Sequence, residues 1–172
     1  MASIRKRTWS SKGRERTAWV VDYFDQVGKR RLKTFATKKA AEDWSITARH
    51  EVRSGVHSPA STSITVAECG ALWLDHCDAE GLEISTIRQR KQHLDLHIYP
   101  VLGRAKLSAL TTPGIYQFDV ELREVGNSLA MRRKILTSLK TMVTFAQSRG
   151  LVAQNVARSV KVNGDRRTNE AP

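Results

Sequence analysis

The stretch His-Leu-Asp-Leu-His-Ile-Tyr-Pro-Val-Leu-Gly-Arg-Ala-Lys-Leu-Ser-Ala-Leu-Thr-Thr, residues 93–112, decides the fold that we expect for this chain. It predicts a helix that runs up to Pro100 and ends near Gly103, because proline and glycine both disfavour continuation of a helix. A short apolar segment then leads to a new helix N-cap at Thr111 or Thr112, where the hydroxyl can accept a backbone hydrogen bond. The stretch therefore predicts two consecutive helices joined by a short connection.

The surrounding residues, 64–162, also have a helical pattern. Thr65 and Glu68 form a capping box that begins a first helix. A short fifth helix is expected over 151–162. The N-caps expected for the second, third and fourth helices are Ser85 or Thr86, Thr112 with Pro113 after it, and Asn127 or Ser128.

Apolar residues recur every three or four positions in the first four helices, which is the spacing of one helix face. Amphipathic helices with short connections predict a compact all-α bundle of four to five helices. The stripes expected to form its core are Val66, Cys69, Trp73 and Cys77; Ile87, Leu94, Ile98 and Val101; Ile115, Phe118, Leu122 and Val125; and Leu136, Leu139, Met142, Val143 and Ala146.

The first third of the chain, residues 1–56, has a strand pattern followed by a helix. Residues 4–9, 17–24 and 29–35 are expected strands, because aromatic and β-branched residues are frequent in them. Gly28 permits the tight turn between the last two strands. A helix should run from an N-cap at Thr37 to Gly55. This segment is therefore predicted to be an α+β domain with a three-stranded antiparallel sheet and one helix.

Strand alternation leaves the exposed face of this sheet undecided. Arg30, Leu32 and Thr34 would share one face of the last strand, whereas Arg31 and Lys33 would share the other. Neither set is purely basic. The pattern alone therefore does not say which face is open to a partner.

The charge of the chain indicates a polyanionic partner. The net charge is +12 and the isoelectric point is about 10.2. Residues 1–57 hold 14 Lys and Arg against 6 Asp and Glu, whereas residues 58–172 hold 15 against 11. A basic excess of this kind usually marks a nucleic-acid-binding protein, and most of it lies in the first third.

The composition argues against a membrane or secreted protein. No apolar run approaches the ~18 residues of a membrane span, and the N-terminus lacks the apolar core of a signal peptide. Cys69 and Cys77 lie eight residues apart on one expected helix, roughly 12 Å by helix geometry, which is too far for a disulfide. We expect two reduced, buried thiols in a cytoplasmic protein of bacterial type that associates with the nucleoid when on DNA.

Two segments resemble parts of phage-type integrases, which belong to the tyrosine recombinase family. Residues 18–44 combine an aromatic strand, a glycine turn, a basic strand, Thr-Lys and an Ala-rich helix, which is similar to the arm-type DNA-binding domain of these integrases. Residues 64–162 resemble their helical, SAM-like core-binding domain. One departure is that Asn155 precedes valine where the family usually has Asn-Pro. The features that carry the second resemblance are Thr65-Val66, Trp73, Ser85-Thr86-Ile87, residues 98–103, Leu107, Leu110-Thr111, Ile115, Phe118, Ala146, residues 149–152 and Asn155.

The resemblance divides the chain into an arm-type domain (1–56), a linker (57–63), a core-binding domain (64–162) and a linker or tail (163–172). It implies that the sheet enters the major groove of arm sites, and that the N-terminal ends of the second and fourth helices face DNA. Arg132 lies close to the apolar stripe of its helix and could instead be partly buried. The candidate DNA contacts are Arg5, Arg7, Arg14, Arg16, Arg30, Arg31 and Lys33 in the first domain, and Ser85, Thr86, Arg88, Arg90, Lys91, Asn127, Ser128, Arg132, Arg133 and Lys134 in the second.

The function that the resemblance implies is recognition of attachment-site DNA during integration and excision of a mobile element. In the family, a separate catalytic domain supplies the tyrosine that attacks a DNA phosphate, without metal or nucleotide. We expect this chain to end before that domain, and therefore to be no enzyme on its own and to need no cofactor.

Two patterns look catalytic or metal-binding without fitting either role. His50 and Arg53 have the His-x-x-Arg spacing of the recombinase active site but lie in the expected helix of the first domain, without its other residues. His93 and His97 could hold zinc on one helix face, but no third ligand is placed by spacing. We expect no metal site and no catalytic residue.

The expected partners are double-stranded DNA, at core and arm sites, other integrase protomers and DNA-bending or excision accessory proteins, with no membrane. Two alternatives remain open at the level of sequence. The same modules could form a stand-alone regulator or a truncated competitor of an integrase. The helical segment could also bind protein as an assembly subunit.

Overall fold

The computed structural model describes residues 2–11, 13–55, 57, 59 and 61–163. The chain divides into two compact units, with the boundary between Ser61 and Thr62. Each unit has its own hydrophobic core. We therefore describe each unit separately.

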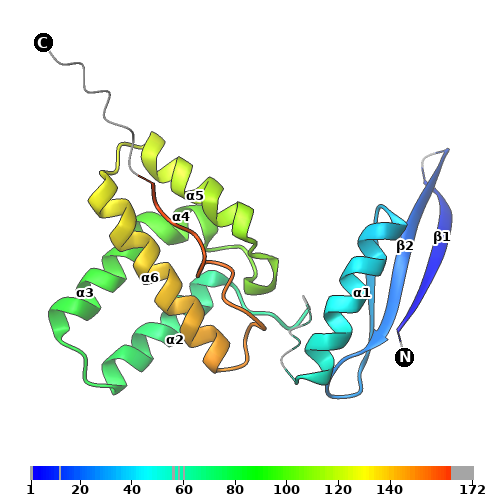
Figure 1. Ribbon diagram of the computed structural model, residues 1–172, viewed down its shortest axis with the longest axis horizontal. Helices are drawn as coiled ribbons and strands as arrows, with labels where there is room; N and C mark the ends of the chain where they lie inside the picture. The colour runs from blue at the N-terminus through cyan, green and yellow to red at the C-terminus, as the bar shows by residue number, and fades with distance from the viewer. Residues whose placement is uncertain (1, 12, 56, 58, 60, 164–172) are drawn as a thin grey trace, which may run out of the picture. The chain divides into compact units, whose positions relative to one another are not determined.

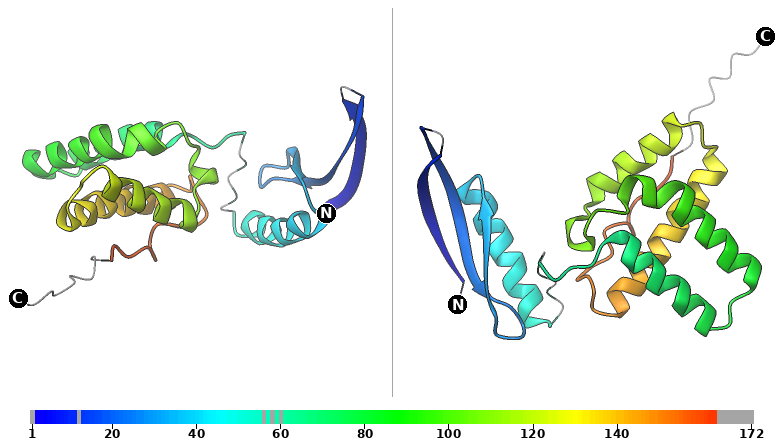
Figure 2. Two further views of the ribbon diagram at one scale, coloured as in Figure 1. Left: turned by 90° about the horizontal axis from the view of Figure 1, so that it is seen from above. Right: turned by 180° about the vertical axis from the view of Figure 1, so that it is seen from behind.

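The first unit is a three-stranded sheet with one helix packed on it. The strands β1 (Ser3–Ser11), β2 (Arg14–Phe24) and β3 (Arg30–Phe35) are antiparallel and lie in the order β1-β2-β3. Helix α1 (Lys38–Arg53) runs along one face, and no element of this unit covers the opposite face (Figures 1 and 2). The predicted α+β architecture is confirmed, including the Thr37 cap, whose hydroxyl accepts a hydrogen bond from the backbone N–H of Ala40.

The turn between β2 and β3 depends on one glycine and one carboxylate. Gly28 has a φ of 75°, which an L side chain rarely adopts. Asp25 accepts hydrogen bonds from the backbone N–H groups of Val27 and Lys29, at 3.1 and 2.8 Å. These bonds fix the turn and with it the pairing of the two basic strands.

His57 packs as a part of the first unit, although the sequence analysis put it at the start of a polar linker. Its side chain is buried, with Nδ1 2.8 Å from a carboxylate oxygen of Glu51 and Nε2 2.9 Å from the hydroxyl of Tyr23. The imidazole also packs edge-on against the Tyr23 ring. Because both ring nitrogens have partners, burial of this polar residue costs little.

The second unit is a bundle of helices, which are labelled in Figure 1. Between its second and third long helices, the chain forms a π-helix, a short α-helix and a 3₁₀ turn, which is the connection that residues 93–112 predict. The elements are α2 (Val66–Ala79), α3 (Ile84–His93), the π-helix η1 (Leu94–Ile98), α4 (Tyr99–Leu102), the 3₁₀ helix η2 (Leu107–Ala109), α5 (Thr112–Glu124) and α6 (Leu129–Ser148).

Most of the buried core of this unit comes from the predicted stripes, although Ile87 is only half-buried. The core also contains residues that were not predicted: Leu107, Ile135, Phe145, Val152, Ala157 and Val160. Every stripe residue from α2 and α6 is buried, and Cys69 and Cys77 are free thiols. Val101 and Val125 are exposed, so their placement in the core was wrong. The π-helix η1 adds a residue to the turn before Val101 and shifts its direction, while Val125 lies beyond the last residue of α5.

One predicted helix start differs from the structure. Helix α3 begins at Ile84 with Glu83 as its N-cap, so Ser85 lies inside the first turn rather than capping it. Pro100 lies in the first turn of α4, where a proline ring is tolerated, and the helix ends at Gly103 as predicted. For α5, the first of the two alternatives is correct, because the Thr111 hydroxyl accepts the cap bond from Gly114.

The expected fifth helix is absent from residues 151–163. This segment, orange to red in Figure 1, is a run of turns and extended backbone that folds back on α6. Asn155 forms a side-chain turn there, in which its Oδ1 accepts from the backbone N–H of Ala157. The Nδ2 group of Asn155 donates to the carbonyl of Lys140 at 2.9 Å, and Lys140 donates from Nζ to the carbonyl of Val160. The segment thus closes the core without helical structure.

Candidate nucleic-acid interface

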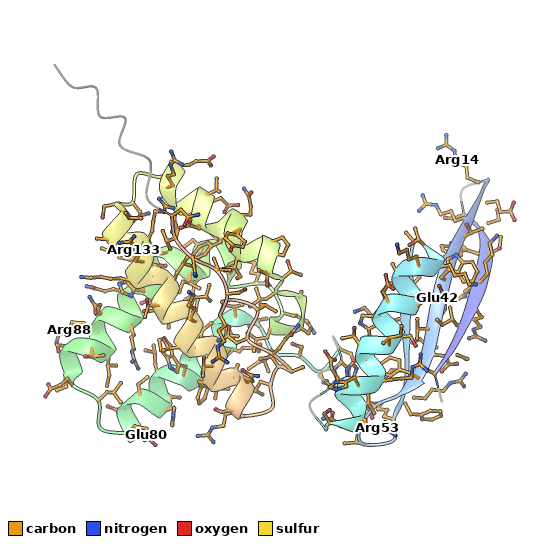
Figure 3. All side chains as sticks on the ribbon, in the orientation of Figure 1. Arg14, Glu42, Arg53, Glu80, Arg88 and Arg133 are labelled. Atoms are coloured by element: carbon orange, nitrogen blue, oxygen red, sulfur yellow. The ribbon has the colours of Figure 1, made fainter. Side chains whose placement is uncertain are left out.

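The open face of the sheet gathers five arginines. In the strand register, Arg5 pairs with Val20, Arg7 with Ala18, and Trp9 with Arg16, so alternate residues of β1 and β2 share this face. All five arginines are exposed, whereas Ala18 and Val20, which lie between them on β2, are buried. Figure 3 shows Arg14 at the tip of the β1–β2 hairpin. The five are Arg5, Arg7, Arg14, Arg16 and Arg30.

The register corrects two of the predicted contacts, because Arg31 and Lys33 lie on the face that α1 covers. Arg31 forms an ion pair with the buried Asp25 at 2.8 Å and donates to the Ser61 hydroxyl. Lys33 lies over the Trp44 ring, 4.6 Å from its centroid, and burial lowers the pKa of its amine. These cations stabilise the first unit and are not presented to a partner.

Arg30 differs from the other arginines of the open face in having a fixed orientation. Its Nε donates to Oδ1 of Asp22 at 2.9 Å and its Nη2 to Oδ2 at 2.5 Å. The Arg30 side chain is 62% exposed, but that of Asp22 is only 11% exposed. The hydrogen bonds from Arg30 lower the pKa of Asp22, and the charge of Arg5 adds to this effect. The carboxylate is therefore ionised and holds the guanidinium at the surface. Sequence reasoning missed Asp22, because only the strand register places it beside Arg30.

The predicted contacts on α3 fall into an exposed and an internal group. Ser85, Arg88 and Lys91 are exposed, although Lys91 forms a surface ion pair with Asp95, a kind of pair that contributes little to stability. Arg90 points inward: its Nη1 lies 2.9 Å from Sγ of Cys77 and its guanidinium lies over the Trp73 ring. Arg90 is thus a packing residue, which contradicts its assignment as a DNA contact. Thr86, in the same turn as Ser85, is half-buried.

At the start of α6, the cap residues bond to the backbone, and the basic side chains differ in exposure. The Ser128 hydroxyl caps the helix by accepting from Met131, and Asn127 donates to a carbonyl at the end of α5. Arg133 and Lys134 are exposed. Figure 3 labels Arg88 and Arg133, which project outward from α3 and α6.

Arg132 is not a surface residue. Its Nε and Nη2 donate to the two carboxylate oxygens of Asp119 at 3.0 and 2.6 Å, and the two side chains are 6% and 11% exposed. The partner lies 13 residues earlier on α5, which no helical periodicity of α6 could reveal. The structure therefore contradicts the assignment of Arg132 as a DNA contact and confirms the alternative that it is buried.

The N-terminal ends of α3 and α6 lie apart in this unit. His93, the last residue of α3, is hydrogen-bonded to Ser138 in α6. Burial lowers the pKa of His93, and the charges of His97 and of the nearby Lys134 add to this effect. A shallow pocket of about 370 Å³ has Leu82, just before α3, and Ser148, at the end of α6, in its lining. The two helices therefore run in opposite senses past each other. Arg133 and Lys134 lie beside the C-terminal part of α3 rather than beside Ser85.

The metal-binding alternative has no support in the arrangement of the histidines. His93 is buried and its Nδ1 is 2.8 Å from the Ser138 hydroxyl. Within the residues that the structure describes, no group of three or more His, Cys, Asp or Glu side chains could hold a metal ion. No described helix has the length and hydropathy needed to cross a bilayer.

Comparisons with known proteins concern the fold of the second unit first. Residues 65–122 match the family model described as phage integrase, N-terminal SAM-like domain. A search of curated protein sequences found no match. The solution structure of an integrase-like domain from Bacillus cereus superposes with a TM-score of 0.57 at 24% identity, over 63% of this chain and 90% of that one. A phage integrase SAM-like domain from Moorella thermoacetica gives 0.52 at 28% identity, over 59% and 87%.

A longer match extends into the first unit. The lambda integrase in a tetramer bound to a Holliday junction superposes with a TM-score of 0.55 at 19% identity, over 85% of this chain. The chain spans 45% of that lambda integrase. The second unit therefore has the fold of these SAM-like domains, and residues 65–122 resemble the phage-integrase family model. The predicted resemblance of the chain to the N-terminal portion of a phage-type integrase is confirmed.

Proposed function

We propose that this chain is the DNA-recognition part of a site-specific tyrosine recombinase. Residues 1–56 bind arm-type sites, residues 57–63 link the domains, and residues 64–162 bind the core of an attachment site. The observation that carries the proposal is the open sheet face, which presents five exposed arginines. Among the described strand residues it has one carboxylate, Asp22, which Arg30 neutralises. A basic sheet face of this kind can enter a major groove.

The helical unit contributes phosphate contacts in this proposal. Arg88 and Lys91 on α3 and Arg133 and Lys134 on α6 are exposed cations that can displace counterions from DNA. Lambda integrase was crystallised as a tetramer on a Holliday junction, which supports other protomers as partners of this chain. DNA-bending or excision accessory proteins and a nucleoid location belong to the same proposal.

The strand-cleaving step is assigned to a catalytic domain outside this chain. Burial raises the pKa of Tyr23 and Tyr99, which is the opposite of what a nucleophilic tyrosine needs. The Tyr23 hydroxyl is also occupied by His57. His50 and Arg53 lie on α1, in the sheet unit, and not in the SAM-like unit.

Duplex binding by fluorescence anisotropy tests this function. Residues 1–172 and 58–172 are titrated on attachment-site and scrambled duplexes at several salt concentrations. We expect log K to fall steeply with log salt for the full chain, and less steeply for 58–172, because the arginine face is removed. We also expect a preference for attachment-site sequence. Absence of binding by both chains at low salt would refute the proposal and favour the protein-binding alternative.

A further inference from the structure

The carboxylate at the centre of the open sheet face needs an explanation if this face binds DNA. Asp22 repels phosphates, so it lowers the affinity of the face for any duplex. It nevertheless lies on the same face as Arg5, Arg7 and Arg30, in β2, the central strand. A residue that only weakens binding has no place there unless it orients one of the cations.

The geometry shows how Asp22 orients Arg30. Phe24 is the register partner of Arg30, and Leu32 is that of Asp22, so Asp22 and Arg30 are diagonal neighbours on one face. The carboxylate takes the Nε edge of the guanidinium, through Nε and one N–H of Nη2. Of the five N–H groups of an arginine, three are left for other acceptors. Two of these, one on Nη1 and one on Nη2, point in parallel away from the Nε atom.

This free edge has the shape that guanine requires. Parallel donors on Nη1 and Nη2 match the O6 and N7 acceptors that guanine presents in the major groove. Because the carboxylate already fixes the torsions of the side chain, less rotamer entropy is lost when the base is bound. A mere phosphate contact would not need such a fixed orientation. Among the described residues, no ion pair holds Arg5, Arg7, Arg14 or Arg16, which suits flexible phosphate contacts.

We propose that Arg30 is the base-reading residue of the sheet and recognises a guanine in the major groove, with Asp22 as its positioning residue. This inference rests on the proposed function, because it assumes that the open face binds duplex DNA. Leu32 is exposed two residues along the same face. Its side chain is placed to contact the methyl group of a thymine within about two base pairs of that guanine.

Selection of binding sites from a randomised duplex pool, with the full chain, tests the assignment. The wild-type chain selects a site with a guanine at one position. Arg30→Lys keeps the charge but loses the fork of donors, so discrimination at that position falls by roughly 5- to 150-fold. Affinity for duplexes that lack the guanine changes little. Asp22→Asn weakens the same discrimination while non-specific affinity rises, because a negative charge is removed.

Two further variants separate base reading from charge. Arg7→Lys, on the same face, is expected to change affinity by a similar factor for every duplex and to leave the guanine selected. Arg53→Lys, on α1, is expected to change neither property. Far-UV circular dichroism checks that each variant is folded.

The results distinguish this inference from the proposed function. If wild type binds duplexes with a steep salt dependence but Arg30→Lys selects the same bases at every position, the assignment of Arg30 is wrong and the proposed function stands. The assignment is equally wrong if Arg7→Lys, and not Arg30→Lys, loses the guanine. If the wild-type chain binds no duplex, both are wrong.

Discussion

Loss of the Arg132 guanidinium should destabilise the helical unit rather than weaken its contact with DNA. Arg132 and Asp119 form two hydrogen bonds at 3.0 and 2.6 Å, with side chains 6% and 11% exposed. Removal of one partner from a buried ion pair leaves an uncompensated charge and costs about 3–5 kcal/mol. Typical domain stabilities are about 5–15 kcal/mol, so Arg132→Ala removes a large share. Urea unfolding of residues 62–172, followed by the fluorescence of Trp73, its one tryptophan, should show a midpoint lower by on the order of 2 M.

Neighbouring and paired substitutions provide the controls for this prediction. Arg133→Ala, at the adjacent exposed position, should change stability by no more than about 0.5 kcal/mol. The double variant Asp119→Leu/Arg132→Met should recover most of the loss, since apolar replacement of a whole buried pair is often nearly neutral. A cost below about 1 kcal/mol for Arg132→Ala, together with a loss of DNA affinity as large as that of Arg133→Ala, would refute the reasoning and restore Arg132 as a surface contact.

Three further predictions concern the core of the helical unit. Burial raises the pKa of the Cys69 thiol to about 11. Above pH 9 the unfolded chain therefore loses a proton that the folded chain keeps, and urea midpoints should fall between pH 9 and 11, less steeply in Cys69→Ala than in wild type. In most helices Gly→Ala stabilises by about 1 kcal/mol, but Gly70→Ala should destabilise by about 1–3 kcal/mol, because its Cβ would lie 2.2 Å from the Tyr99 hydroxyl oxygen. Thermal unfolding should show a lower Tm, and Tyr99→Phe should partly restore it. Burial, with the charges of His97 and Lys134, lowers the pKa of His93. The contribution of neutral His93 to the stability of the helical unit should therefore be complete above pH 6.5 and be lost as the pH drops below it. A pH series of unfolding midpoints should show a weaker fall for His93→Gln.

Local signals predicted the fold because each acts within a few residues. The capping box at Thr65, the caps at Thr37 and Ser128 and the turn at Gly28 all depend on neighbours that the sequence places together. The stripes of α2 and α6 follow from helix periodicity in the same way. The π-helix η1 has no comparable local signal, so the direction of Val101 could not be foreseen.

The candidate interface could be predicted only in part, because it depends on pairings between distant residues. The excess of positive charge indicates a polyanion, but alternation in β3 does not say which face α1 covers. The register of three strands was needed to separate Arg30 from Arg31. Likewise, the roles of Arg90 and Arg132 depend on partners 13 residues away, Cys77 and Asp119.

The salt dependence of duplex binding tests the central claim, that the open sheet face binds DNA, most directly. Two triple variants of the full chain each remove three positive charges: Arg5→Ala/Arg7→Ala/Arg16→Ala on the open face, and Lys38→Ala/Lys39→Ala/Arg53→Ala on α1. Each phosphate contact contributes about 0.9 to the slope of log K against log salt. The account predicts that the open-face variant loses a slope of about 2–3, while the α1 variant keeps the wild-type slope. Equal slopes for the two variants would contradict it.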